Sequence, residues 1–261
     1  MVRTLPVSLR AWCICAVFST LLISSCKKAI DAELPDEAYI TELKSFLASS
    51  SGYTVEKVNY SPASKTFIVD KDVEVTMQDA EAHLLASKSS ASNPAGRTAQ
   101  RKLYYMVSPS IAPAIKVYIN SSVPASWRSS IDSAIANWNA AGSLINISKV
   151  KSSSKANVTI GANFSETATI ASSNYPQSNG YPGKNIYINT YYNNLQETYK
   201  IFAITHEFGH AFGLTHTDGT YGYLIAGTPL TDPGSVMNTY VSNWIGFSTY
   251  DFLAIRIVYP K

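Results

Sequence analysis

The sequence predicts an α+β fold of α/β-like character, with a twisted mixed sheet, helices packed on it and a small N-terminal module before it. Three observations support this prediction. Alternating apolar residues at 114–120 indicate a strand, and a helical pattern follows at 124–141. Further strands are expected at 144–150 and 157–164, and the strand–helix–strand order implies a right-handed parallel crossover. Residues 87–102 hold almost no large apolar side chain and mark the best domain boundary.

The first 25 residues are expected to be a signal peptide rather than part of the fold. Arg3 and Arg10 flank an apolar run, residues 11–23, that is too short to span a membrane as a helix. The run leads into Leu-Ile-Ser-Ser-Cys, which resembles the lipobox of bacterial lipoproteins. That resemblance implies cleavage before Cys26 and lipidation of its sulfur; an ordinary signal peptide with a chance cysteine is the alternative. Cleavage would remove the other two cysteines, so we expect no disulfide.

A lipidated Cys26 would anchor an otherwise soluble protein to a membrane. We therefore expect a location in the bacterial cell envelope, with the outer membrane or the cell surface as candidates. Removal of the signal peptide leaves 19 basic and 18 acidic residues, a near-neutral balance that gives no reason to expect nucleic acid as a partner. We expect the mature chain to be a monomer.

The mature chain is expected to hold two folded parts. They are a small module with its tether at 26–88 and a larger domain at 103–261, and a linker at 89–102 joins them. Within the module the periodicity predicts a helix, two strands and a second short helix, at residues 36–50, 65–70, 73–76 and 78–87. His83 lies in the second of these helices. We expect it to be a surface residue rather than a ligand, because no partner is spaced to join it.

Residues 206–216 read His-Glu-Phe-Gly-His-Ala-Phe-Gly-Leu-Thr-His and contain three of the four histidines in the chain. Apolar residues at helical period place this motif on a mostly buried helix. His206 and His210 are one turn apart, so both can bind one zinc ion through imidazole nitrogens. Gly213 would end the helix in a left-handed turn. His216 can then become the third ligand, which leaves the fourth position for water.

Glu207 follows the first ligand and is therefore close to the metal without coordinating it. One catalytic zinc would lower the pKa of its bound water and polarise a substrate carbonyl, and Glu207 would move the proton of that water to the leaving amine. The residues thus predict peptide hydrolysis without a covalent intermediate. A closed structural zinc site is the alternative, but a charged Glu207 on a buried helix face argues against it. Calcium sites stay open, although no calcium loop is recognisable.

The pattern H-E-x-x-H-x-x-G-x-x-H resembles that of the metzincin zinc metallopeptidases, and residues 206–218 most resemble the bacterial dual-action HEIGH metallopeptidases. The resemblance covers roughly residues 103–261. It implies the metzincin zincin fold, with two long helices, an active-site helix, a Met-turn and a C-terminal helix, here expected at 248–258. Ser-Val-Met-Asn around Met237 matches the Met-turn, whose methionine lies beneath the zinc histidines; ordinary core packing is the alternative. Some metzincins have a tyrosine ligand two residues later, but Thr239 stands there, so that role is not carried over.

The resemblance also implies that a protein or peptide substrate binds as an added strand at the edge of the sheet, assigned here to residues 184–189. Tyr240, Trp244 and Phe247 follow the Met-turn and are candidate walls of the S1′ pocket. Asp218 either accepts a hydrogen bond that orients a zinc histidine, or only caps the turn.

The leading prediction is a zinc metalloendopeptidase that hydrolyses peptide bonds of extracytoplasmic proteins. The alternative is a surface-anchored peptide- or glycan-binding lipoprotein on a metzincin scaffold. A stretch rich in tyrosine suggests this second function: Tyr175, Tyr181, Tyr187, Tyr191 and Tyr192.

The role of the N-terminal module has two interpretations. It could be a latency propeptide, with the basic linker residues Arg97, Arg101 and Lys102 as the cleavage site. A lipidated cysteine cannot block the zinc, so a carboxylate such as Asp70 or Asp72 would have to do so. The other interpretation is a spacer between membrane and enzyme.

Overall fold

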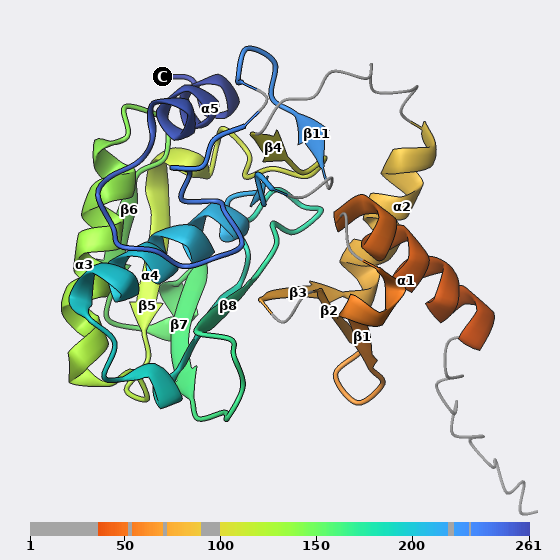
Figure 1. The fold of residues 1–261 in the computed structure, drawn as a ribbon, viewed down its shortest axis with the longest axis horizontal. Coiled ribbons are helices and arrows are strands. Elements are labelled where there is room, and N and C mark those ends of the chain that lie inside the picture. The colour runs from red at the N-terminus through yellow and green to blue at the C-terminus, as the bar shows by residue number, and fades with distance from the viewer. Residues whose placement is uncertain (1–35, 52–53, 70–71, 90–99, 219–221, 230) are drawn as a thin grey trace, which may run out of the picture. The chain divides into compact units, whose positions relative to one another are not determined.

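The computed structural model describes residues 36–51, 54–69, 72–89, 100–218, 222–229 and 231–261 of the 261-residue chain (Figure 1). The expected signal peptide, Cys26, Asp70 and Arg97 lie outside the described residues. Among the described helices, none has both the length and the apolar character that a membrane crossing requires.

The described strands form an eight-stranded and a three-stranded sheet. The larger sheet consists, in spatial order, of β1 (Val58–Ser61), β2 (Thr66–Val69), β3 (Val73–Thr76), β8 (Ala171–Asn174), β9 (Asn185–Asn189), β7 (Val158–Asn163), β5 (Ile115–Ile119) and β6 (Ile147–Val150). The smaller sheet consists of β10 (Leu214–Thr215), β4 (Arg101–Lys102) and β11 (Tyr223–Leu224). Strands β9, β7, β5 and β6 pair in parallel, whereas β8 runs antiparallel to β9. The predicted α+β class with a mixed sheet is therefore confirmed.

The described helices lie close to the positions that the apolar periodicity predicts. The described α-helices are α1 (Glu37–Ser51), α2 (Met77–Ser89), α3 (Ala125–Ala140), α4 (Glu197–Ala211) and α5 (Thr249–Val258). Short 3₁₀ helices connect other elements at Val55–Lys57, Ala112–Ala114, Ser153–Lys155 and Thr190–Tyr192. Helix α4 packs against α3 and against strands β8 and β9, and it crosses β5 and β7 in Figure 1. The motif helix is therefore held between a second helix and the sheet.

Two apolar cores lie beneath these elements. The larger one joins α3, α4, α5 and the parallel strands, and Trp138 at its centre donates from its indole nitrogen to the Thr205 carbonyl at 3.0 Å. The smaller one belongs to the N-terminal module, where α1 and α2 pack on β1, β2 and β3. Leu103 and Tyr175 are its members from outside the module. The module thus has an apolar core of its own.

The prediction that residues 184–189 form an edge strand is wrong. Strand β9 occupies these residues, but it lies between β8 and β7. The strand outside it is β8, whose sequence Ala-Ser-Ser-Asn has no apolar alternation and which therefore lacks a strand pattern. On its other side β8 pairs with β3 of the N-terminal module.

The prediction that His83 lies on the surface is also wrong. Its side chain is 4% exposed and packs edge-on against the Tyr105 ring, with centroids 5.1 Å apart. Burial lowers the pKa of His83 to about 4, so the ring is neutral at pH 7. It is not a member of the histidine cluster on α4.

Candidate metal centre

Helix α4 carries the first half of the histidine motif on its most buried stretch. His206, Glu207 and His210 are each at most 5% exposed. The helix ends at Phe212, and Gly213 then adopts φ +99°, a left-handed conformation that L side chains rarely take. The chain continues as β10 and reaches His216, as the glycine in the sequence predicts.

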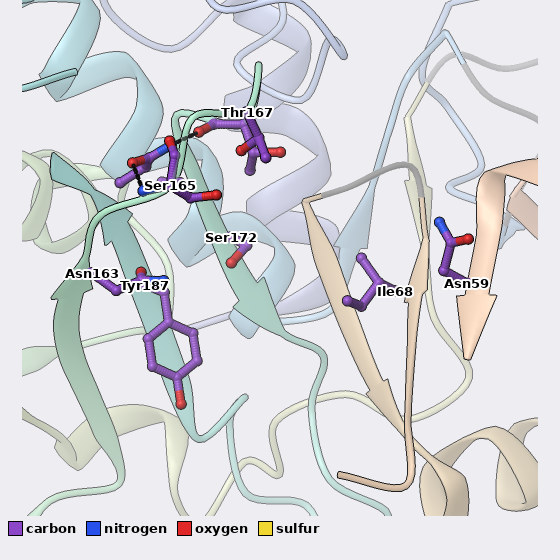
Figure 2. Close-up of a pocket in the computed structure, with 10 residues that line it drawn as sticks. Asn59, Ile68, Asn163, Ser165, Thr167, Ser172 and Tyr187 are labelled. Carbon is purple, nitrogen blue, oxygen red and sulfur yellow. Dashed lines mark hydrogen bonds between the residues drawn. The ribbon is translucent and has the colours of Figure 1, made fainter. Parts of the chain in front are cut away.

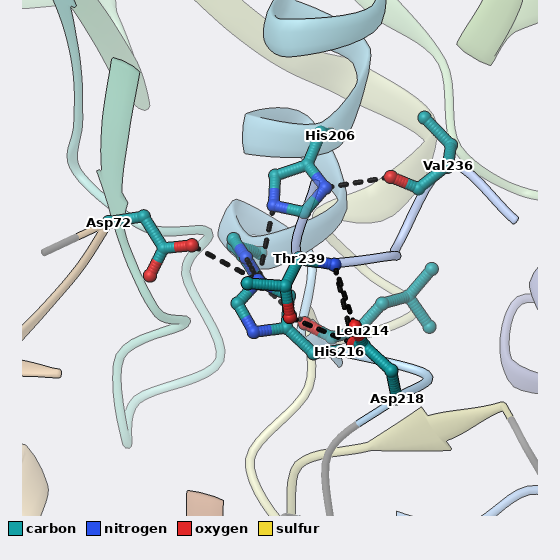
Figure 3. A network of polar contacts seen from close by, with 8 residues as sticks. Asp72, His206, Leu214, His216, Asp218, Val236 and Thr239 are labelled. Carbon is teal, nitrogen blue, oxygen red and sulfur yellow. Dashed lines mark hydrogen bonds and ion pairs between the residues drawn. The ribbon is translucent and has the colours of Figure 1, made fainter. Parts of the chain in front are cut away.

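The three histidines of the motif converge on one point. The Nε2 atom of His216 lies 3.1 Å from that of His210 and 3.3 Å from that of His206 (Figure 3). Zinc–nitrogen bonds of about 2.0–2.1 Å in a tetrahedron place two ligand atoms about 3.3 Å apart. These nitrogens therefore have the spacing that one tetrahedral metal ion requires, so the residues present fit the zinc that the sequence predicts.

Backbone carbonyls orient two of the rings. His206 donates from Nδ1 to the Val236 carbonyl at 2.7 Å, and His210 donates from Nδ1 to the Leu214 carbonyl at 3.0 Å. A proton on Nδ1 leaves the lone pair of Nε2 available for a metal. Burial lowers the pKa of His206 to about 4 and holds the pKa of His210 well below its usual range, so both rings are in the neutral form that ligands need.

Met237 lies directly under the motif helix. It is fully buried, and a Cβ added at Gly209 would come within 2.3 Å of its sulfur. A tight turn contains it, with Asn238 donating from its backbone nitrogen to the Ser235 carbonyl at 3.3 Å. The methionine thus packs against the motif helix at Gly209, the residue before His210.

Glu207 borders a cavity of about 420 Å³ that His206 and Tyr240 also line. Burial first, and the nearby Asp72 carboxylate second, raise the pKa of Glu207 well above its ordinary value. Its Oε2 atom has no hydrogen-bond partner among the described residues. A carboxyl group with a free oxygen beside the histidine cluster is placed as a general base requires.

Asp72 joins the histidines from outside the catalytic domain. It precedes β3, and its Oδ2 atom lies 3.1 Å from Nε2 of His216 (Figure 3). One ligand atom from each of Asp72, His206, His210 and His216 lies within 4.8 Å of every other. Of the two carboxylates named as candidate blocking groups, this is the one that the structure describes.

The remaining predicted residues fall in different places. Asp218 accepts from Thr239, at 2.8 Å from its hydroxyl and 3.3 Å from its backbone nitrogen, so it ties two loops together rather than accepting from a histidine. Tyr240 lines the cavity beside Glu207, but Trp244 is not among the residues that line it. Trp244 packs instead against the Phe247 ring, with centroids 5.3 Å apart.

The sequence analysis did not predict the buried polar network beside the turn that contains Met237. The Asp251 carboxylate accepts from the Ser235 hydroxyl at 2.6 Å, from the Val236 backbone nitrogen at 2.9 Å and from the Gln100 side chain at 3.0 Å. Ser248 and Asp251 also form a capping box that begins α5. The spacing Ser-x-x-Asp before an apolar run was the one available signal.

A family profile for dual-action HEIGH metallo-peptidases matches residues 67–234. The chain belongs to this family. The matched region of this HEIGH metallo-peptidase begins within β2, earlier than residue 103, where the sequence resemblance was placed, and so it includes Asp72 as well as the histidine motif. The match ends before Met237. Membership makes the chain a metallopeptidase and agrees with the expected family.

Two solved structures of another metallo-peptidase chain are also similar to this one. A crystal structure of myroilysin is 20% identical, covers 56% of this chain and 83% of its own, and gives a TM-score of 0.41. A second myroilysin structure is 17% identical, covers 56% of this chain and 92% of its own, and gives a TM-score of 0.42. The comparison with curated proteins found no match.

Proposed function

We propose that this HEIGH metallo-peptidase is a zinc-dependent endopeptidase of the metzincin type that cleaves extracytoplasmic proteins. The observation that supports it most strongly is the convergence of three histidine Nε2 atoms beside a cavity that Glu207 lines. His206, His210 and His216 would hold the metal. Zinc bound there would polarise the scissile carbonyl and activate a water molecule.

The side chains of this chain supply the remaining chemistry. Glu207 takes a proton from the attacking water and delivers it to the leaving amine, because its free oxygen faces the same cavity as His206. An extended peptide would pair with β8, the strand outside β9, and lead its scissile bond toward the histidines. Tyr240, which is 81% exposed and borders the cavity, would contact the substrate residue after that bond.

We further propose that lipidation of Cys26 anchors the enzyme to the bacterial envelope. The lipobox-like sequence before this cysteine supports the proposal. The anchor would restrict the enzyme to substrates near the membrane. Growth with a radiolabelled fatty acid tests it: label should enter the wild-type chain and be absent after Cys26→Ser.

The binding-protein alternative has less support. Tyr175 of the tyrosine-rich stretch is 5% exposed and lies edge-on to the His210 ring at 5.6 Å, so it offers no open face for stacking. The metallopeptidase family and the position of Glu207 favour catalysis.

Glu207→Ala tests the proposed mechanism. The variant should keep about one zinc per chain and lose about 10²–10⁴-fold in kcat/KM on a peptide library read by mass spectrometry, because the general base is gone while the ligands remain. Glu197→Ala is the matched control, since Glu197 starts the same helix and its carboxylate accepts from the Ser129 hydroxyl rather than lining the cavity beside the histidines. Measurable cleavage at equal rates by the Glu207 variant and the wild type would rule out this mechanism.

A further inference from the structure

We infer that the full-length chain is a latent form, in which Asp72 is the fourth metal ligand and β3 covers the sheet edge that a substrate strand requires. The inference rests on the proposed zinc-peptidase function and assigns a regulation to the same site. It decides between the two interpretations of the N-terminal module in favour of a propeptide.

The position of Asp72 is that of a ligand. Its Oδ2 atom is 3.1 Å from Nε2 of His216, which is close to the edge of about 3.3 Å expected between ligands of a tetrahedral zinc. The two histidine–histidine distances, 3.1 and 3.3 Å, fit the same tetrahedron. Three histidines leave one vertex, and the Asp72 carboxylate stands where a water molecule would otherwise bind.

The surroundings of the Asp72 carboxylate also favour a bound cation. Its Oδ1 atom is buried and has no hydrogen-bond partner among the described residues. A buried carboxylate oxygen without a donor is unfavourable unless a cation lies beside it, because its charge is otherwise uncompensated.

Strand β3 holds Asp72 in place and covers the substrate edge. Ser173 of β8 donates from its backbone nitrogen to the Asp72 carbonyl at 2.9 Å. Strand β3 then runs parallel to β8, with Val73 opposite Ser173 and Glu74 opposite Asn174. A peptide that adds to β8 needs the same backbone groups. The module therefore obstructs both the metal and the sheet edge with one short segment.

The junction is suited to release. Among the described residues, β3 and β8 pair at two positions, and the Asp72 carbonyl adds one more backbone hydrogen bond. Beside them lies a cavity of about 310 Å³, where Asn59 and Ile68 of the module face Ser172 and Tyr187 (Figure 2). A second cavity of about 680 Å³ is lined by residues of β2 and β7, among them Thr66 and Thr159. The module supplies most of its apolar core itself, and Leu103 and Tyr175 are the buried members that its removal would uncover.

Cobalt(II) in place of zinc in the full-length chain reports on the fourth ligand directly. Asp72→Cys should give a strong near-ultraviolet thiolate-to-cobalt absorption band. The matched control is Glu74→Cys, two residues further along the same strand, which should give none. Equal bands in the two variants, or none in either, would overturn the assignment of Asp72 as a ligand.

Access to the metal is measured with acetohydroxamate, a small chelating ligand for an open metal site. The cobalt spectrum of Asp72→Asn should respond at a concentration at least tenfold lower than that of the wild type. Glu74→Gln should behave as the wild type, because a glutamine oxygen can still accept from Asn174. Circular dichroism checks that both variants are folded. If the cobalt spectra of the wild type and Asp72→Asn responded at the same acetohydroxamate concentration, Asp72 would not be blocking access to the metal.

Peptide cleavage by the zinc forms separates latency from the proposed function. Asp72→Asn should cleave at least tenfold faster than the wild type, with Glu74→Gln unchanged. Equal rates would refute latency through the Asp72 carboxylate. If every variant lacks activity while the cobalt results come out as expected, Asp72 remains the fourth ligand and the peptidase function is the part that fails.

Discussion

Gly209 shows how closely the metal centre is packed at the scale of one residue. Replacing a glycine inside a helix by alanine ordinarily raises the free energy of unfolding by about 1 kcal/mol, because alanine is the better helix former. Here the added Cβ would lie 2.3 Å from the Met237 sulfur and 3.1 Å from its terminal methyl carbon. The methionine is fully buried, so it has little room to move.

We therefore expect Gly209→Ala to lower the free energy of unfolding by about 1–3 kcal/mol, as overpacking does in other cores. Urea denaturation of the metal-free chain measures this. Gly234→Ala is the control, because its Cβ would meet nothing closer than 3.8 Å and should change stability little. An unchanged or higher stability of the Gly209 variant would mean that Met237 is not wedged under the helix.

His83 predicts a dependence of stability on pH. Burial lowers its pKa to about 4 in the folded chain, against about 6.5 when unfolded. The contribution of neutral, buried His83 to the free energy of unfolding is therefore fully present above pH 6.5. As the pH falls from 6.5 toward 4, the unfolded chain takes up a proton on His83 first, and the free energy of unfolding falls by up to about 1.4 kcal/mol per pH unit. His83→Phe keeps the ring contact with Tyr105 and removes the titrating group.

Urea unfolding of the wild type and of His83→Phe at several pH values between 4 and 7 tests this. The difference in unfolding free energy between the two should shift in favour of the variant as the pH falls, whereas the metal-site histidines contribute equally to both. A difference that does not change with pH would show that His83 is not buried as a neutral ring.

At the scale of elements, α5 stabilises the loop that supports the metal centre. Asp251 in its first turn accepts from Ser235 and from the backbone nitrogen of Val236, and the Val236 carbonyl in turn accepts from His206. The Asp251 carboxylate of the C-terminal helix thus helps to hold the His206 ring in its orientation. Burial raises the pKa of Asp251, and the hydrogen bonds from Ser235, Val236 and Ser248 oppose this shift because they stabilise the ionised carboxylate.

Asp251→Ala should lower the free energy of unfolding by about 3 kcal/mol, because several buried donors lose their partner. It should also weaken zinc binding by about 10–100-fold, since the support of a ligand is removed. Chelator competition and urea unfolding measure the two effects. Asp251→Asn, which keeps the shape and one acceptor oxygen, should lose less on both counts; zinc affinity equal to wild type in the alanine variant would contradict the link.

At the scale of the whole molecule, the N-terminal module and the rest of the described chain share one sheet, and the core of the module also includes Leu103 and Tyr175. Arg101 and Lys102, two of the three residues named as the cleavage site, form β4 and pair on both sides with β10 and β11. Gln100 before them is 1% exposed and donates to Asp232 and Asp251. A cut that activates the enzyme should therefore fall before Gln100 and leave β4 with the catalytic domain.

Brief trypsin treatment tests this arrangement. We expect a fragment that begins just before Gln100, with peptide cleavage at least tenfold above that of the intact chain once the module dissociates. Arg101→Gln should not prevent the cut, whereas Arg97→Gln should. Cleavage at this position with unchanged activity would count against the module as an inhibitor.

The sequence by itself determined the local features of this protein. Periodicity predicts α3, α4 and α5, and the motif gives three histidines and a glycine whose roles follow from helix geometry within eleven residues. It also indicates the metallopeptidase family, to which the chain belongs. These features could be predicted because the atoms that decide them are neighbours in the chain.

Only the tertiary structure decided that β8 is the strand that lies outside β9 and that β3 of the N-terminal module pairs with it. Strand β8 has no apolar alternation, and its pairing with β9 and β3 depends on partners that are distant in sequence. The same holds for Asp251, and for Asp72, which lies more than 130 residues before the histidine that it meets. From the sequence alone Asp72 could be named as a candidate blocking group. Its position beside His216 depends on strand pairing, whose free energy comes from contacts between segments remote in the chain.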